Sequence, residues 1–212
     1  VIILGGGPAG LTAAIYTCRA RLKTLLLERA LPGGQITMAD RVENFPGFPQ
    51  GINGMELGDL MHQQAARFGL ETLTAEVTGV EVVGDIRLVH ATSGDYQCLA
   101  LIVALGAEHQ KLGVPGEAEL LGKGVSYCAN CDGAFFQGQE VAVVGGGNSA
   151  IADALFLTRL VDKVYIVHRR RQLRAEAILQ EQAQASPRIE FVWDSVVERG
   201  EGDGVVRGLR LR

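Results

Sequence analysis

The sequence predicts an α/β protein made of two units, each of which opens with a strand, a glycine-rich turn and a helix. The first observation is an internal repeat, because Val1–Gly10 (VIILGGGPAG) aligns with Val141–Ala150 (VAVVGGGNSA). The second is that each copy leads through a helix-compatible segment to a second strand, at 23–28 and at 163–168. Such β-α-β beginnings, repeated far apart in the chain, indicate two Rossmann-like domains and not a solenoid, whose repeat is much shorter.

The composition limits the classes of function. The 212 residues, 47% of them hydrophobic, are enough to bury the core of one large domain or two small ones. The net charge is −4, which leaves no overall basic surface for nucleic acid or an anionic membrane. The longest apolar run, at 99–107, is too short to cross a bilayer. We therefore expect a cytoplasmic protein that binds neither nucleic acid nor membrane.

The region between the two copies predicts one helix and several strands. Helical spacing runs through 55–69, where Gly69 is well placed to end the helix, with apolar positions at Leu57, Leu60, Met61, Ala65 and Phe68. Four β-rich segments at 71–75, 77–83, 86–92 and 98–104 suit a small antiparallel sheet that leads into a buried strand. Turn residues at 110–117 place a domain boundary there, which gives domains at 1–109 and 110–212.

The first glycine motif has the context of a dinucleotide site. Gly5, Gly7 and Gly10 lie between a strand and a helix, and Glu28 ends the next strand, where a carboxylate can bind ribose hydroxyls. Gly5 permits the turn, Gly7 lets backbone N–H groups reach a pyrophosphate, and Gly10 allows close packing of helix and strand. The alternative is a tight strand–helix turn with Glu28 as a solvated charge.

The second motif, Gly145, Gly147 and Ala150, differs at the end of its second strand. The residue aligned with Glu28 is His168, and three arginines follow it. Cations at this place favour a 2′-phosphate, so the second site is expected to prefer NADPH, whereas the acidic first site suits FAD. A solvated basic strand end is the alternative. Two different nucleotide sites in one chain imply electron transfer between two cofactors.

Cys128 and Cys131, at i and i+3 in YCANCDG, can close a small disulfide that exchanges readily. Asp132 follows directly and is placed to move protons as the pair opens and closes. A zinc site and a purely structural turn are the alternatives, although the remaining cysteines and histidines show no ligand spacing. Cys18 and Cys98 are expected to be small core residues.

The order of motifs GGGPAG, GGQ, ENFPGFP, CANCDG, GGGNSA and HRRRQLR closely resembles the low-molecular-weight, bacterial-type thioredoxin reductases, along the whole chain. That resemblance implies three-layer ββα-type nucleotide-binding domains, of which the FAD domain is incomplete in this chain. It also implies homodimers that use FAD and NADPH to reduce thioredoxin or a thioredoxin-like protein.

The resemblance also implies roles for individual residues. The FAD-binding positions are Gly5, Gly7, Pro8, Ala9, Gly10, Glu28, Arg29, Gly34, Gln35, Asn44, Ala104 and Gly106. The NADPH-binding positions are Gly145, Gly147, Asn148, Ser149, His168, Arg169, Arg170 and Arg174, of which the three arginines hold the 2′-phosphate. Cys131 faces the flavin, Cys128 attacks the partner disulfide, Asp132 shuttles the proton, and Gln110–Gly116 is one of two hinge segments about which the NADPH domain rotates.

Several positions depart from the family pattern. Ala152 and Asp153 stand where a pair of glutamates is common, Leu105 replaces a threonine, and Asn130 is a less usual residue between the cysteines. The family also continues into a segment that completes the FAD domain, so for this chain we expect weak or no FAD retention and little turnover. The alternative functions are reduction of a peroxiredoxin-system or glutaredoxin-like protein, a flavin-dependent dithiol oxidase, and a nucleotide-binding module without catalysis.

Overall fold

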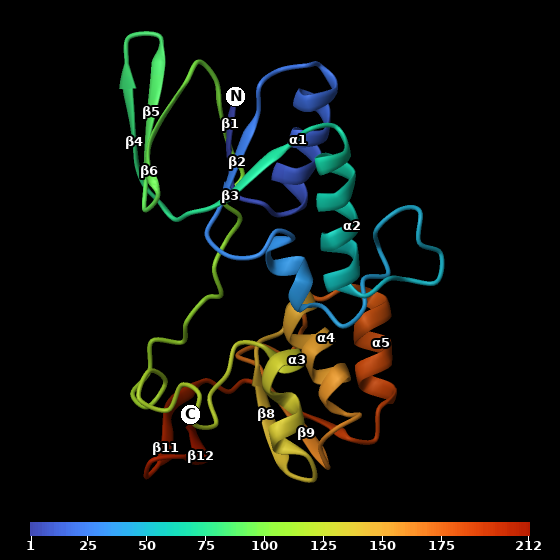
Figure 1. Cartoon of the computed structure of the whole chain (residues 1–212). Helices are drawn as coiled ribbons and strands as arrows, with labels where there is room; N and C mark the ends of the chain where they lie inside the picture. The colour runs from blue at the N-terminus through green and yellow to red at the C-terminus, as the bar shows by residue number, and fades with distance from the viewer. The chain divides into compact units, whose positions relative to one another are not determined.

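A computed structural model describes all residues, 1–212, and the chain folds as two units, Val1–Glu108 and His109–Arg212 (Figure 1). The expected boundary lay between residues 109 and 110, next to this division. Both units are α/β with parallel sheets, which confirms the fold class. None of the helices has both the length and the apolar character that crossing a bilayer requires.

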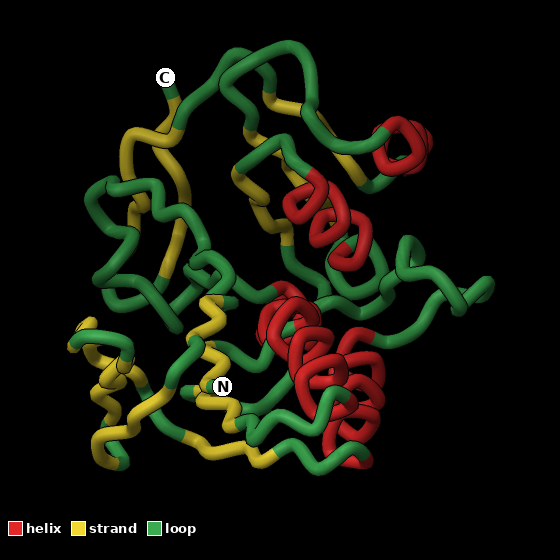
Figure 2. The backbone as a smooth tube through the Cα atoms, turned by 90° about the horizontal axis from the view of Figure 1, so that it is seen from above, coloured by secondary structure: helices red, strands yellow, loops and turns green.

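The first unit is built on a four-stranded parallel sheet. Its strands are β1 (Ile2–Leu4), β2 (Leu25–Glu28), β3 (Glu71–Thr74) and β7 (Leu101–Val103), in the order β3-β2-β1-β7. Two helices, α1 (Pro8–Arg19) and α2 (Gly54–Arg67), lie side by side along this sheet (Figures 1 and 2). A short 3-10 helix, η1 (Gly34–Met38), packs against α2.

A second sheet makes this unit three-layered. The strands β4 (Val77–Val83), β5 (Ile86–Ala91) and β6 (Gly94–Cys98) form an antiparallel sheet. Side chains alternate across β1 and β2, so that Ile3 and Leu26 pack with the helices, whereas Ile2, Leu4 and Leu27 pack in a second core with residues of the antiparallel sheet. The ββα layering expected from the resemblance is therefore present in this unit.

The structure corrects two strand assignments. The β-rich pattern places 71–75 in the antiparallel sheet, but Glu71–Thr74 pairs parallel with Leu25–Glu28. The apolar pattern predicts one buried strand at 98–104, but β6 ends at Cys98 and β7 begins at Leu101. Val103 is 65% exposed, so β7 is not fully buried. Residue patterns alone do not identify the partner of a short strand, which tertiary packing decides.

Helix α2 begins and ends close to the expected positions. Asn53 is its N-cap, and Gly69, with φ +92°, follows the C-cap Phe68. Three of the expected apolar positions are buried, namely Leu57, Met61 and Ala65, whereas Leu60 is 41% exposed and does not join the core. Cys18 and Cys98 are buried free cysteines, which confirms their assignment to the core.

The second unit repeats the parallel architecture on a smaller scale. Strands β8 (Glu140–Val144), β9 (Lys163–Val167) and β10 (Ile189–Val192) form a parallel sheet in the order β10-β9-β8. Its helices are α3 (Ala129–Asp132), η2 (Gly133–Phe136), α4 (Asn148–Leu157) and α5 (Ala177–Ala185). The core of this unit includes Ile151, Ala154, Val164 and Ile166, which are fully buried.

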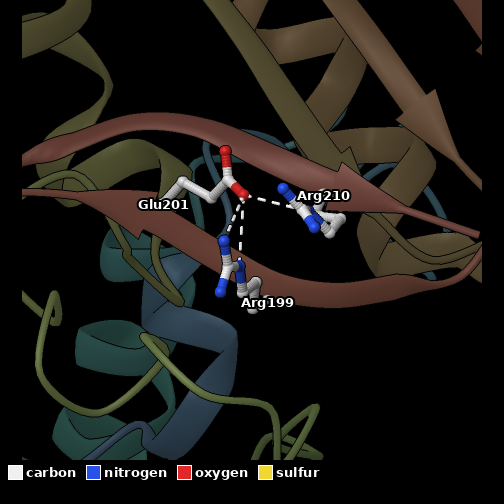
Figure 3. Close-up of polar contacts among 3 residues, drawn as sticks. All are labelled: Arg199, Glu201 and Arg210. Atoms are coloured by element: carbon white, nitrogen blue, oxygen red, sulfur yellow. Dashed lines mark hydrogen bonds and ion pairs between the residues drawn. The ribbon is translucent and has the colours of Figure 1, made fainter.

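A two-stranded hairpin, β11 (Val197–Gly202) and β12 (Val206–Leu211), completes the second unit. Figure 3 shows the carboxylate of Glu201 between two arginines, where its Oε1 accepts from Arg199 Nη2 at 2.9 Å and from Arg210 Nε at 3.0 Å. These contacts, chiefly the one with Arg199, hold the pKa of Glu201 below its usual value. Because the three side chains come from both strands, they favour the observed register.

Candidate active site

The first glycine-rich turn joins β1 to α1 and leaves no room for side chains at two of its glycines. Gly5 has φ +100°, and a Cβ there would lie 2.3 Å from the carbonyl oxygen of Ala104. A Cβ at Gly10 would lie 1.9 Å from the Gly5 carbonyl oxygen. Gly7 differs, because the atom nearest to its Cβ position is 3.9 Å away, in Gly34. The chain's own packing requires Gly5 and Gly10, whereas a Cβ at Gly7 would make only ordinary van der Waals contact with Gly34.

The start of α1 fits an anionic ligand. Pro8 lies in its first turn, and the N-cap Gly7 provides no side-chain hydrogen bond. The neighbouring Ala9 is exposed. The unpaired N–H groups and the dipole of a twelve-residue helix suit a phosphate group.

Glu28 is held in place by the backbone and is not a freely solvated charge. Its Oε2 accepts a hydrogen bond from the Gly6 N–H at 2.6 Å, and its Oε1 accepts one from the Ala30 N–H at 3.0 Å. Both donors fix the carboxylate at the carboxyl end of β2, beside the glycine-rich turn. This is the place where a carboxylate can accept hydrogen bonds from ribose hydroxyls.

A groove of ≈ 330 Å³ lies beside Glu28, and further residues predicted to bind FAD line it. Its walls are formed by Gly5, Leu27, Glu28, Arg29, the segment 75–77 and the segment 105–108, which includes Gly106. The Gln35 side-chain amide donates to the Ala107 carbonyl on the same segment, and Arg29 pairs with Glu108 at 3.3 Å. Asn44 lies exposed between η1 and α2, and no hydrogen bond connects it to this groove.

The segment that follows Glu28 packs directly on the glycine-rich turn. The Gly33 N–H donates to the Gly6 carbonyl at 2.7 Å. Gly34 has φ +64°, and a Cβ there would lie 2.9 Å from the Gly7 Cα. The glycines of PGGQ, Gly33 and Gly34, are therefore explained by the close approach of this segment to the backbone of the first glycine-rich turn.

The second glycine-rich turn, between β8 and α4, repeats this geometry. Gly145 has φ +143°, and a Cβ there would lie 3.0 Å from the Ala150 Cβ, so Ala150 fits where Gly10 is needed in the first turn. No atom lies within 4 Å of the Cβ position at Gly147. Ser149 is exposed at the start of α4. The open backbone and the helix N-terminus again fit a pyrophosphate.

His168 is buried and packs against the second glycine-rich turn. The side chain is 6% exposed, and its Nε2 lies 3.1 Å from the Gln172 carbonyl oxygen. A Cβ at Gly146 would lie 2.6 Å from the imidazole ring, so the ring and the middle glycine are in close contact. His168 thus packs under the turn at the position where Glu28 bonds the first one, and its contact with a cofactor stays a prediction.

The arginines after His168 divide into two groups. Arg171 forms an ion pair with Asp194, with Nε 2.5 Å from Oδ2. Arg169, Arg170 and Arg174 are exposed and form no ion pair in the structure. Three guanidinium groups are therefore available to an anion, and they are the three that the resemblance assigns to the 2′-phosphate.

Cys128 and Cys131 form a disulfide at the start of α3. Cys128 is the N-cap of this helix, and the Cys131 N–H lies 3.1 Å from the Cys128 Sγ. The N–H group can therefore stabilise negative charge on the Cys128 sulfur after reduction. Ser126 accepts a hydrogen bond from the Cys128 N–H at 3.0 Å and fixes the approach to the helix. Asp132 is half-buried in the last position of α3.

The surroundings of the four cysteines bear on the zinc alternative. No group of three or more histidine, cysteine or acidic side chains is arranged to hold a metal ion. Cys18 and Cys98 are buried and unpaired, in the other unit.

The expected hinge segment is anchored at its C-terminal end. Residues 104–114 form neither helix nor strand. Glu117, 7% exposed, accepts hydrogen bonds from the N–H groups of Leu112 at 2.8 Å and Gly113 at 2.6 Å, and from the Tyr127 hydroxyl at 2.7 Å. Because Tyr127 directly precedes Cys128, one buried carboxylate links the end of this segment to the redox pair.

The positions that depart from the family pattern lie in different surroundings. Asp153 is half-buried on α4, where burial raises its pKa and the nearby His109 partly offsets this effect. Ala152 and Leu105 are exposed, and Asn130 is half-buried within α3. The roles of these four residues in cofactor binding stay predictions.

Sequence reasoning missed two polar residues of this site. Glu117 organises the segment before the redox pair, and Glu176 bonds Asn148 of the second turn, with Asn148 Nδ2 3.0 Å from its Oε1. Neither glutamate belongs to a motif that sequence reasoning could use. The partners of Glu117 are 4, 5 and 10 residues away and that of Glu176 is 28 residues away, so only the folded chain shows these contacts.

Comparison with known proteins places the chain in a family. The family model for pyridine nucleotide-disulphide oxidoreductases matches residues 1–211. The thioredoxin reductase of Bacillus subtilis is 50% identical over 212 residues, which are 100% of this chain and 67% of the relative. The thioredoxin reductase of Streptomyces coelicolor is 51% identical, over 100% of this chain and 66% of the relative. The chain thus spans about two-thirds of the length of these relatives.

Solved structures agree with this result. The crystal structure of Lactococcus lactis thioredoxin reductase has a TM-score of 0.98 and 45% identity, over 100% of this chain and 70% of that one. The thioredoxin reductase of T. acidophilum has a TM-score of 0.94 and 31% identity, over 100% of this chain and 69% of that one. The chain therefore belongs to the pyridine nucleotide-disulphide oxidoreductase family and, within it, groups with the bacterial-type thioredoxin reductases.

Proposed function

We propose that the protein transfers electrons from NADPH through FAD to the Cys128–Cys131 disulfide, and from there to the disulfide of thioredoxin or a thioredoxin-like protein. The observation that carries this proposal is the disulfide itself, at a helix start where the Cys131 N–H points to the Cys128 Sγ. It occurs in a chain with two strand–glycine turn–helix units, and the relatives at about half identity are named thioredoxin reductase.

Each cofactor is assigned to one turn. The first turn, with no side chain at Gly7 and the fixed carboxylate of Glu28, suits FAD, whose ribose hydroxyls are free to donate to Glu28. The second turn, with open space at Gly147 and three unpaired arginines nearby, suits the 2′-phosphate of NADPH. When bound, FAD supplies a two-electron carrier that NADPH reduces and that returns the disulfide to the dithiol.

The two cysteines then perform disulfide exchange. The Cys128 thiolate attacks one sulfur of the partner's disulfide, forms a mixed disulfide and releases the partner's other sulfur as a thiolate. The Cys131 thiolate attacks the Cys128 sulfur, which restores the disulfide and releases the partner's second thiolate. Two electrons leave the pair in each cycle. The Cys131 N–H supports the choice of Cys128 as the attacking group, because it stabilises charge on that sulfur.

Asp132 is the proposed proton carrier of this exchange. It directly follows Cys131, and its carboxylate takes part in no hydrogen bond or ion pair in the structure. A half-buried carboxylate beside the pair can take the proton from a thiol and later return it to a leaving thiolate.

We infer the setting of the protein from the same resemblance. The proposed location is the cytoplasm, and two buried free cysteines, Cys18 and Cys98, agree with a reducing compartment. The proposed assembly is a homodimer, which light scattering of the purified protein would test.

Trapping of the mixed disulfide tests the proposed relay. In Cys131→Ser protein loaded with FAD, NADPH should still bleach the flavin under anaerobic conditions, while reduction of thioredoxin should stop. The variant should also accumulate a stable mixed disulfide between Cys128 and the partner, whereas Cys128→Ser should not. If Cys131→Ser still reduced thioredoxin at the wild-type rate, the relay would be wrong.

A further inference from the structure

The segment Arg169–Glu176, here called the arginine segment, is fastened to the second glycine-rich turn by a pair of side chains. We propose that the Asn148–Glu176 pair is a latch that positions Arg174 and thereby sets the selectivity of the second site for a 2′-phosphate. The inference rests on the proposed NADPH site and adds to it a positioning residue, Glu176, that lies outside the expected site.

The latch consists of two reciprocal hydrogen bonds. The Asn148 Nδ2 donates to the Glu176 Oε1 at 3.0 Å, and the Glu176 N–H donates to the Asn148 Oδ1 at 2.8 Å. Asn148 is the first residue of α4, and Glu176 is the N-cap of α5, with no side-chain cap of its own. The pair therefore joins the first turn of one helix to the residue that starts the next.

The backbone beside the latch is bound to the same turn. The Gly146 carbonyl accepts from the Arg174 N–H at 2.7 Å and from the Ala175 N–H at 3.1 Å. Leu173 and Ala175 are buried in the core of the unit, whereas Arg174 between them is exposed. Because both neighbours are buried and the backbone is bound to the Gly146 carbonyl, the Arg174 side chain is exposed beside the second glycine-rich turn.

The charge of Glu176 and its hydrogen bonds to Asn148 should affect phosphate binding in opposite directions. A carboxylate close to a phosphate site repels the ligand, so a glutamate here would weaken binding if it acted only through its charge. Its hydrogen bonds to Asn148 instead hold the C-terminal end of the arginine segment, two residues after Arg174. A guanidinium that is already in position loses less conformational entropy when it binds phosphate.

These two effects have opposite signs, which makes the proposal testable by substitution. Glu176→Ala removes both the charge and the Asn148 Nδ2 bond. If charge dominated, a 2′-phosphate would bind more tightly to this variant. If the latch dominates, it binds more weakly. Glu176→Gln removes only the charge, because the amide oxygen still accepts from Asn148.

The experiment is calorimetric titration of the full chain with adenosine 2′,5′-bisphosphate and with 5′-AMP, neither of which needs the flavin. We expect the wild type to prefer the bisphosphate, and Glu176→Ala to reduce the affinity ratio about tenfold, the scale of one hydrogen bond to a charged group. Glu176→Gln should retain the wild-type ratio or exceed it. Glu181→Ala, which removes an exposed glutamate of α5 that forms no polar contact, is the matched control and should change nothing.

The possible outcomes distinguish a failure of the latch from a failure of the proposed NADPH site. A wild type without preference for the bisphosphate would contradict the proposed NADPH site. A wild type with that preference, together with an unchanged or increased ratio in Glu176→Ala, would refute the latch alone. Glu176→Ser repeats the test with a residue that is favourable at a helix N-cap, so that α5 still forms if alanine destabilises it.

Discussion

At the scale of single residues, a substitution at Gly147 can test nucleotide binding without a large effect on stability. Gly147 has φ −97° and no atom within 4 Å of its Cβ position, so Gly147→Ala adds a methyl group without strain. We expect its free energy of unfolding to stay within about 1 kcal/mol of the wild type. Its affinity for NADP⁺ should fall at least about tenfold, because the methyl group occupies the approach to the pyrophosphate. Calorimetry and urea denaturation measure the two effects.

A neighbouring glycine provides the control for this prediction. A Cβ at Gly146 would lie 2.6 Å from the buried imidazole of His168, so Gly146→Ala should lower stability whether or not a nucleotide binds. An unchanged NADP⁺ affinity in Gly147→Ala would mean that no pyrophosphate approaches this turn.

The buried carboxylate of Glu117 predicts a pH-dependent contribution to stability. Burial raises its pKa, but the hydrogen bonds from the backbone N–H groups and the Tyr127 hydroxyl outweigh burial and hold the pKa below its usual value. A lowered pKa stabilises the fold at pH values above the pKa of the unfolded chain, and this stabilisation is lost as pH falls through the folded pKa. Glu117→Gln should therefore cost about 1–3 kcal/mol near neutral pH and less below about pH 4.

Urea denaturation of wild type and Glu117→Gln at several pH values measures this effect. Tyr127→Phe, which removes one of the donors and keeps the carboxylate, should cost less than Glu117→Gln at neutral pH. An equal cost of Glu117→Gln at all pH values would show that the charge on Glu117 contributes nothing.

The residues that sequence reasoning identified are those whose chemistry is encoded locally. The two glycine motifs and the CxxC pair are contiguous, so their spacing alone fixes a turn or a small loop. Glu117 and Glu176 act on backbone groups and side chains that the fold brings to them, as in the bond between Glu176 and Asn148. Polar pairs of this kind leave no period or motif in the sequence, which is why they were missed.

At the scale of elements, the N-cap of α2 is a local determinant that can be tested alone. The Asn53 Oδ1 accepts from the N–H groups of Met55 at 2.9 Å and Glu56 at 3.3 Å, and its Nδ2 donates to the Asp40 carbonyl at 3.0 Å. Asn53→Ala should lower the free energy of unfolding by about 0.5–2 kcal/mol, as the loss of an N-cap does. Asn53→Asp keeps the accepting oxygen and should lose less. Equal losses in both variants would assign the effect to the bond with Asp40.

The sequence predicted which helices and strands form better than it predicted which strands pair with each other. The internal repeat correctly indicated β1, α1 and β2, helical spacing indicated α2, and β-rich composition indicated β4 and β5. The same patterns do not determine whether Glu71–Thr74 pairs with a strand of the parallel or of the antiparallel sheet. That choice depends on α2, which returns the chain to the edge of β2.

At the scale of the whole molecule, the two units should respond to different ligands. The proposed FAD contacts lie in Val1–Glu108 and the proposed NADPH contacts in His109–Arg212, and each turn is closed by contacts of its own unit. A ligand that binds only one folded unit stabilises that unit in proportion to the logarithm of its concentration. Hydrogen exchange can therefore report the two sites separately, peptide by peptide.

Adenosine 2′,5′-bisphosphate should slow hydrogen exchange in peptides that cover 145–149 and 169–176 and leave those that cover 5–10 and 28–35 unchanged. The reason is that the unpaired arginines of the second unit match its 2′-phosphate, whereas Glu28 in the first unit lies where that phosphate would be and would repel it. FAD should produce the reverse pattern. At a ligand concentration of about 100 times Kd, the protection should approach about 2.7 kcal/mol in the occupied unit. Protection of the same peptides by both ligands would contradict the assignment of one nucleotide to each unit.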